Sequence, residues 1–140
     1  MTIGVPQMSS NSRHLKSDYY QPNTLFHAPI GDSPKHILDI GTGKGSWAID
    51  VADFYPTATI RGVDLFPPPV TWMPPNCFFE VDDVLKDWTW REPFDFIHLR
   101  MMYGAFDSEG WNQVYKRAYD PNRLSSQCPS SRWLDRASGV

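Results

Sequence analysis

Three glycines at alternate positions follow an aspartate in the run DIGTGKG. The four residues are Asp39, Gly41, Gly43 and Gly45. Glycine lets a ligand approach the backbone closely and adopts backbone angles that other residues avoid. A helix that begins directly after such a turn offers unpaired N–H groups and a partial positive charge to a ligand. The spacing therefore predicts a cofactor-binding turn.

The spacing of the glycines argues against two common nucleotide-binding loops. The dinucleotide pattern G-x-G-x-x-G needs a further glycine where the chain has Ser46. The phosphate loop G-x-x-x-x-G-K-[ST] needs Ser or Thr after Lys44, where Gly45 stands. A nicotinamide-dependent oxidoreductase is therefore the less favoured alternative, and an NTPase is disfavoured more strongly.

Hydrophobic patterning places this turn between a strand and a helix. Residues 36–40 form a short apolar run between a proline and a glycine, which is typical of a buried strand in a parallel sheet. Ser46 can cap a helix that ends before Pro56, and residues 59–64 are predicted as a second strand. A strand, turn, helix and strand within about 28 residues match one βαβ unit. We therefore expect a right-handed crossover and a parallel sheet.

Two further strands and a second helix are predicted after a proline-rich loop. The prolines between residues 65 and 76 exclude regular structure there, because proline lacks an N–H donor. Residues 77–81 and 94–99 are predicted as strands. Ser108 can cap a helix that ends before Pro121. The expected apolar face of this helix contains Trp111, Val114, Tyr115 and Ala118.

The composition excludes several classes of function. The chain has 140 residues, enough for one domain, and 13 basic against 16 acidic residues give a net charge of -3. That balance offers no long-range attraction to nucleic acid or anionic lipid. Two cysteines, Cys77 and Cys128, support neither a disulfide framework nor a metal site. Without a long apolar run or a secretory signal, we expect a soluble protein of the cytoplasm, with the nucleus as the alternative.

The acids that follow the strands complete a pattern that resembles a known family. Asp64 closes the second predicted strand, and Asp82 and Asp83 follow the third. With the acid and glycines of the first strand, this order resembles class I S-adenosylmethionine-dependent methyltransferases. The closer resemblance is to the fungal LaeA-like methyltransferases of secondary metabolism. The stretches that carry it are LFHAPI (25–30), residues 37–69, residues 72–83 and FDFIHLRMMYGAF (94–106).

The resemblance implies a fold and a role for each acid. It implies an α/β, Rossmann-like fold with about four parallel strands in the order 3-2-1-4 and flanking helices. The glycine turn (residues 41–45) would line the methionine and ribose portion of S-adenosylmethionine, with Asp39 beneath it. Asp64 would accept both ribose hydroxyls. Asp82 or Asp83 would meet the adenine amino group, and Asp82 is slightly favoured.

The resemblance assigns no catalytic residue. Alignment of the methyl acceptor with the methyl group can supply much of the acceleration, so no base is compulsory. His98 could assist a hydroxyl acceptor, but a structural role is favoured for both His98 and Arg100. The acceptor would be a small molecule or a protein.

The resemblance ends near Asn122. We expect a flexible leader over residues 1–24, the cofactor-binding domain over residues 25–122, and a disordered or unrelated tail over residues 123–140. Family members continue into further strands, so we expect an incomplete, C-terminally truncated domain in which residues 94–99 form an uncovered sheet edge. A methyltransferase is the first reading. The alternative is an inactive cofactor-binding remnant that acts as a regulatory or partner subunit, or that self-associates, through this edge.

Overall fold

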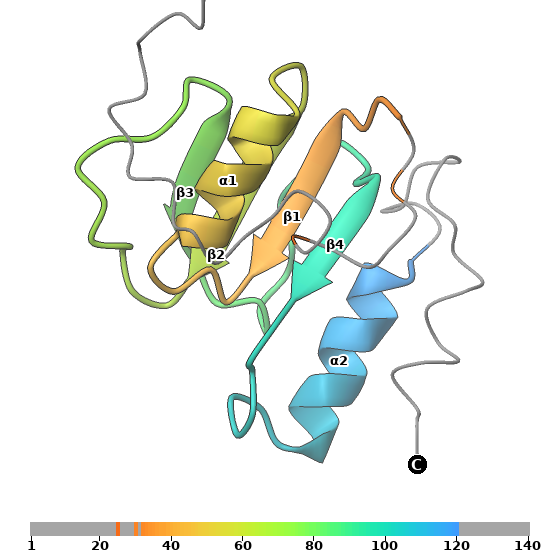
Figure 1. Ribbon diagram of the computed structural model, residues 1–140. Coiled ribbons are helices and arrows are strands. Elements are labelled where there is room, and N and C mark those ends of the chain that lie inside the picture. The colour runs from red at the N-terminus through yellow and green to blue at the C-terminus, as the bar shows by residue number, and fades with distance from the viewer. Residues whose placement is uncertain (1–24, 26–29, 31, 121–140) are drawn as a thin grey trace, which may run out of the picture.

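Four parallel strands and two helices are the regular elements of this computed structural model, which describes residues 25, 30 and 32–120 (Figure 1). In chain order they are β1 (His36–Ile40), α1 (Ser46–Phe54), β2 (Thr59–Asp64), β3 (Cys77–Val81), β4 (Phe96–Leu99) and α2 (Ser108–Ala118). The predicted leader and tail, residues 1–24 and 123–140, lie outside the described residues. The predicted α/β fold class is confirmed.

The sheet has the strand order β3-β2-β1-β4, and each neighbouring pair is parallel. The order that the resemblance implied is therefore confirmed. Because all four strands run in the same direction, their carboxyl ends meet at one edge of the sheet. Open parallel sheets bind their ligands at these strand ends, which we call the carboxyl edge of the sheet.

Residues that pair across the sheet form rows whose side chains lie on one face. The row under α1 is apolar, and it packs with Ala48 and Val51 of that helix in one core cluster. Its members are Cys77, Ile60, Ile37 and Phe96. The next row on the same face lies nearer the carboxyl ends. It contains Phe79, Gly62, Asp39 and His98.

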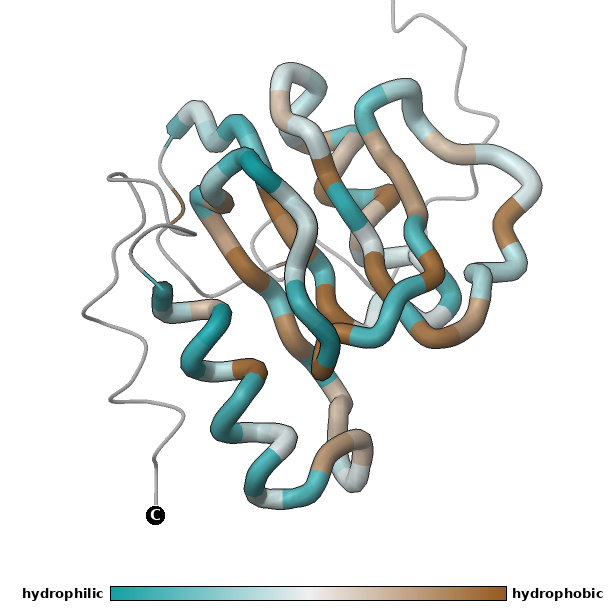
Figure 2. Tube along the Cα trace, turned by 180° about the vertical axis from the view of Figure 1, so that it is seen from behind, coloured by the Kyte–Doolittle hydropathy of each residue, from teal (hydrophilic) through white to brown (hydrophobic). Residues whose placement is uncertain are grey.

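A second core cluster covers the opposite face. Leu38, Ile40 and Val63 of the sheet pack there with the segment between β3 and β4 and with α2. Figure 2 shows the chain trace from behind, relative to the view of Figure 1. The contributing residues outside the sheet are Val84, Trp88, Trp90, Phe94, Val114 and Ala118. Trp88 and Trp90 are thus buried core residues, whereas Trp72 is 51% exposed.

Both predicted helix caps are wrong by one residue. Ser46 is the first residue of α1, and the capping position belongs to Gly45, which has no side chain to offer. Ser108 is likewise the first residue of α2, and the cap is Asp107, whose Oδ1 accepts a hydrogen bond from the N–H of Gly110 at 2.7 Å. An aspartate serves this position well because its carboxylate also meets the positive end of the helix dipole.

The buried face of α2 differs from the predicted one. Gly110, Val114 and Ala118 are buried, whereas Trp111 is half-buried and Tyr115 is exposed. Gly110 lets the helix approach the segment after β3, since a Cβ added there would lie 3.4 Å from the Cδ2 of Leu85. The apolar pattern alone did not include this glycine.

β4 begins at Phe96 rather than at residue 94. The carboxylate of Asp95 accepts the backbone N–H groups of Lys35 and His36 at 2.6 and 2.9 Å. A side chain thus binds backbone donors at the entrance to β1, and the regular ladder starts one residue later.

Candidate functional site

The glycine turn joins β1 to α1 at the carboxyl edge of the sheet. The N–H groups of Gly41 and Thr42 both donate to the carbonyl of Val63, at 2.8 and 3.0 Å, and this fastens the turn to β2. Gly41, Gly43 and Gly45 have φ angles of 71°, 57° and 78°. These values lie in the left-handed region that favours glycine.

The three glycines have different surroundings. A Cβ added at Gly45 would lie 2.6 Å from the ring of Phe79, and one added at Gly41 would lie 2.1 Å from the sulfur of Met102. At Gly43 the nearest atom would be a backbone oxygen 4.0 Å away. Gly43 is exposed, so its backbone forms the open side of the turn.

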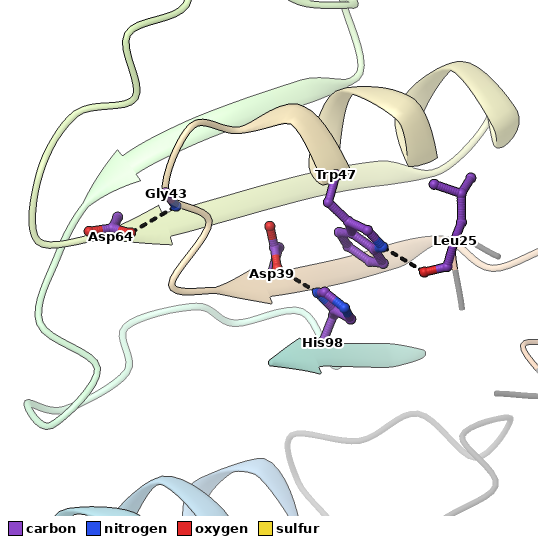
Figure 3. Close-up of polar contacts among 6 residues, drawn as sticks. All are labelled: Leu25, Asp39, Gly43, Trp47, Asp64 and His98. Atoms are coloured by element: carbon purple, nitrogen blue, oxygen red, sulfur yellow. Dashed lines mark hydrogen bonds and ion pairs between the residues drawn. The ribbon is translucent and has the colours of Figure 1, made fainter. Parts of the chain in front are cut away.

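The structure brings Asp64 to the glycine turn. Its Oδ2 accepts the N–H of Gly43 at 2.8 Å (Figure 3). Its Oδ1 accepts the N–H of Phe66 at 3.3 Å. The carboxylate is half-buried at the end of β2. A negatively charged acceptor therefore stands beside the open side of the turn.

Asp82 and Asp83 lie at the carboxyl end of β3. The N–H of Asp82 donates to the carbonyl of Asp64 at 3.0 Å, so the two acids that close β2 and β3 are neighbours through the backbone. The Oδ1 of Asp82 accepts a hydrogen bond from the N–H of Asp83 at 2.7 Å. The Oδ1 of Asp83 accepts one from the N–H of Leu85 at 3.0 Å. Both side chains are half-buried.

Asp39 and His98 form a pair on adjacent strands beneath the turn. The Nδ1 of His98 lies 2.8 Å from the Oδ1 of Asp39, and the residue Asp39 is only 3% exposed (Figure 3). Trp47 of α1 stacks on the imidazole, with ring centroids 3.7 Å apart and the planes 6° from parallel. The indole Nε1 of Trp47 donates to the carbonyl of Leu25 at 2.7 Å. His98 is thus enclosed by packing and hydrogen bonding.

Several residues at this edge were not predicted as part of the site. Phe79 covers Gly62, where an added Cβ would lie 2.7 Å from the phenyl ring and also 2.7 Å from the hydroxyl oxygen of Thr42. That hydroxyl is buried, and within the described part of the chain it has no hydrogen-bond partner. A glycine inside a strand is a signal of close approach by a neighbour, so Gly62 could have indicated this packing. Lys44 is exposed.

Cys77 is an inert group in the row below the site. Burial raises the pKa of its thiol to about 12, and the charges of Asp39 and Asp53 add to this effect. A thiol of this kind is a poor nucleophile at neutral pH. The described residues contain no group of three or more potential metal ligands, and none of their helices is long and apolar enough to cross a membrane.

Two fungal proteins have sequences similar to this chain. The chain is 47% identical to methyltransferase pytC of Aspergillus terreus over 96 residues, which cover 68% of this chain and 29% of pytC. It is 37% identical to the secondary metabolism regulator LAE1 of Cochliobolus heterostrophus over 116 residues, which cover 79% of this chain and 36% of LAE1. These relatives confirm the resemblance to fungal LaeA-like methyltransferases, and the chain spans about a third of their length.

A solved structure has a similar fold, and a family model matches most of the chain. The fold is similar to that of human N-acetylserotonin methyltransferase, solved in complex with S-adenosylmethionine, with a TM-score of 0.55 and 19% identity. That similarity covers 75% of this chain and 30% of the human chain, and it confirms the Rossmann-like fold. The family model described as "Methyltransferase domain" matches residues 12–120. The chain therefore belongs to the methyltransferase domain family.

Proposed function

We propose that this chain binds S-adenosylmethionine at the carboxyl edge of its sheet and forms the donor-binding part of a methyltransferase of fungal secondary metabolism. Family membership and the two fungal relatives support this assignment. The observation that carries it is the Asp64 carboxylate, which lies against the open glycine turn within hydrogen-bond distance of Gly43. In this proposal residues 25–122 are the cofactor-binding domain.

The groups at this edge fit the chemistry of the donor. The half-buried Asp64 carboxylate suits the two ribose hydroxyls, which are neutral donors. The glycine turn leaves space at Gly43, where an added Cβ would meet nothing closer than 4.0 Å. The buried Asp39 beneath the turn suits a ligand with positive charge. The buried Thr42 hydroxyl, which has no hydrogen-bond partner among the described residues, is a further polar group near the turn.

Two acids, Asp82 and Asp83, are placed where they can contact the adenine of the donor. Asp82 and Asp83 each retain one carboxylate oxygen outside the local hydrogen bonds. Either can accept the adenine amino group, and we favour Asp82 because its backbone joins that of Asp64.

The chain's own contribution to catalysis is binding and orientation. When bound, S-adenosylmethionine supplies a sulfonium whose methyl group is open to in-line displacement. Alignment of the acceptor with that methyl group lowers the barrier without a protein base. We therefore assign no catalytic residue and give His98 and Arg100 structural roles. The acceptor is a small molecule or a protein, and the site of action is the cytoplasm or the nucleus.

Isothermal titration of the wild-type chain with S-adenosylmethionine and with NAD tests the proposal. We expect binding of the first and none of the second. Asp64→Ala should weaken binding by about ten- to a hundred-fold, because hydrogen bonds to a charged acceptor contribute about 1.5–3 kcal/mol. Asp87→Ala, which removes a fully exposed carboxylate, is the matched control and should leave the affinity unchanged. A wild-type chain that ignores the donor at millimolar concentration refutes the assignment.

A second candidate is a non-catalytic partner subunit. β4 is the terminal strand of the described sheet, and its four residues are only half-buried, so its outer edge is the proposed place for addition of a partner's strand. Transfer of a labelled methyl group separates the two functions. Donor binding without any transfer, together with a stable complex in which another chain pairs with β4, favours the partner subunit.

A further inference from the structure

The ring of Phe79 lies between two glycines that come from different elements. Phe79 belongs to β3, Gly62 belongs to the neighbouring strand β2, and Gly45 ends the glycine turn at the capping position of α1. A Cβ added at Gly62 would lie 2.7 Å from both the Cδ1 and the Cε1 of the ring. One added at Gly45 would lie 2.6 Å from the Cζ and 2.9 Å from the Cε1. One edge of the ring therefore spans the distance from β2 to the end of the turn.

The two ends of the glycine turn are held in different ways. At its beginning, two N–H groups of the turn donate to the carbonyl of Val63 in β2. At its end, the hydrogen bonds of Gly45 join it to the turn and the helix: its N–H donates to the carbonyl of Thr42 at 2.9 Å, and its carbonyl accepts from Ile49 at 3.0 Å. The ring of Phe79 fills the space between this end of the turn and β2.

The size of the ring therefore sets the height of the turn above the sheet. Protein interiors are closely packed, and a smaller side chain leaves a cavity into which neighbouring groups partly relax. Here the neighbouring group is the start of α1, which lies over β2 and β3 (Figure 1). Because Gly45 is two residues from Gly43, such a movement changes the position of the Gly43 backbone relative to the Asp64 carboxylate.

We propose that Phe79 is a positioning residue for the methyl donor, and that it acts through the glycine turn. This inference rests on the proposed function, in which the donor binds against the turn and Asp64. A site that is already ordered binds its ligand more tightly, because less binding energy is used to order it. The ring supplies this order at the end of the turn where α1 begins.

Phe79→Leu tests the proposal by isothermal titration with S-adenosylmethionine. Leucine keeps the Cδ atoms of the side chain and lacks the Cε and Cζ atoms that lie beside Gly45. The dissociation constant should rise by about five- to tenfold, the effect of one lost hydrogen bond. Circular dichroism establishes a temperature at which the variant is fully folded, so that the titration measures the affinity of the folded chain and not its stability.

Phe94→Leu is the matched control. It makes the same change in a ring that is 1% exposed, in the core cluster on the opposite face of the sheet. It should lower the free energy of unfolding and leave the dissociation constant unchanged. A purely structural role of Phe79 predicts this same result for Phe79→Leu.

A second route changes the other side of the contact. Gly45→Ala places a methyl group against the tip of the ring and should also weaken donor binding, because it pushes the turn away from the sheet. In the double variant Gly45→Ala and Phe79→Leu, the methyl group enters the space that the ring has left. The double variant should therefore bind the donor more tightly than Gly45→Ala alone, whereas independent effects would add.

The outcomes separate this inference from the proposed function. If folded Phe79→Leu binds the donor as tightly as the wild-type chain, or if Phe94→Leu weakens binding equally, Phe79 has only a structural role and the inference is wrong, while donor binding stands. Additive losses in the double variant also overturn it. If Phe79→Leu does not fold, Gly45→Ala decides, and an unchanged affinity there overturns the inference. If the wild-type chain does not bind the donor, the proposed function fails and the inference fails with it.

Discussion

Individual residues at the glycine turn are constrained in two different ways. Gly43 and Gly45 both have left-handed backbone angles, but only Gly45 also lies against another side chain, the ring of Phe79. The left-handed backbone angle disfavours any residue with a Cβ at either position. The steric constraint acts only where the neighbour cannot move, and a phenyl ring packed between Gly45 and Gly62 has little freedom.

Alanine substitutions at the two glycines separate these constraints. Gly43→Ala should lower the free energy of unfolding by about 1 kcal/mol, the cost of a left-handed angle for a residue with a Cβ. Gly45→Ala should lower it by about 2–5 kcal/mol, because overpacking adds to that cost. Urea denaturation followed by circular dichroism measures both. Equal losses in the two variants would show that the contact with Phe79 relaxes freely.

The reactivity of Cys77 reports on its burial. Since burial raises its pKa to about 12, the thiolate is scarce at pH 9, where an ordinary cysteine is substantially ionised. In a Cys128→Ser variant, which leaves Cys77 as the single thiol, iodoacetamide at pH 9 should react far more slowly with the folded chain than with the chain in urea. Mass spectrometry follows the reaction. Equal rates in both conditions would contradict the burial of this side chain.

The two helices begin in different ways, because different residues precede them. α1 begins after a glycine whose backbone is needed by the turn, so its first N–H groups receive no side-chain cap. α2 begins after Asp107, whose side chain caps it. The missing cap thus coincides with the helix that faces the candidate site.

Substitutions at the start of α2 test the assignment of its cap. Asp107→Ala should lower the free energy of unfolding by about 1 kcal/mol, because it removes the acceptor of the Gly110 N–H. Ser108→Ala should change it by less than about 0.5 kcal/mol, because Ser108 does not cap the helix. Thermal or urea unfolding distinguishes them. A larger loss in Ser108→Ala would restore the cap expected from the sequence pattern.

Across the whole of the described structure, the sheet has an edge at β4 next to exposed apolar side chains. Met101 and Tyr103, directly after β4, are 78% and 95% exposed. Unpaired strand edges with apolar neighbours promote association. We expect the chain to self-associate through this edge.

Charged substitutions beside the edge test this expectation. The double variant Met101→Lys and Tyr103→Lys should shift the sedimentation profile toward monomer at micromolar concentration, because like charges oppose pairing of two edges. Val81→Lys, at an exposed position of the other edge strand β3, is the control and should leave the profile unchanged. A wild-type chain that is monomeric throughout would contradict self-association, and an effect of Val81→Lys alone would place it at β3.

The sequence by itself determined the elements and the glycine turn of this protein. Residues 36–40 are a short apolar run between a proline and a glycine, and such a pattern depends only on neighbours along the chain. The order of the motifs along the chain predicted the strand order and the family. The structure confirms the strand order, and the family model confirms the family. The exact helix caps were missed, because serine and aspartate both suit a cap and only the backbone path decides between them.

Only the tertiary structure decided which residues share the space beneath the turn. The row of Phe79, Gly62, Asp39 and His98 joins four strands, and its members are brought together by the register of the sheet. Register depends on contacts between segments far apart in the sequence, so no local pattern reveals it. The pairing of Asp39 with His98 and the stacking of Trp47 on that histidine follow from this register and from the position of α1 over the sheet.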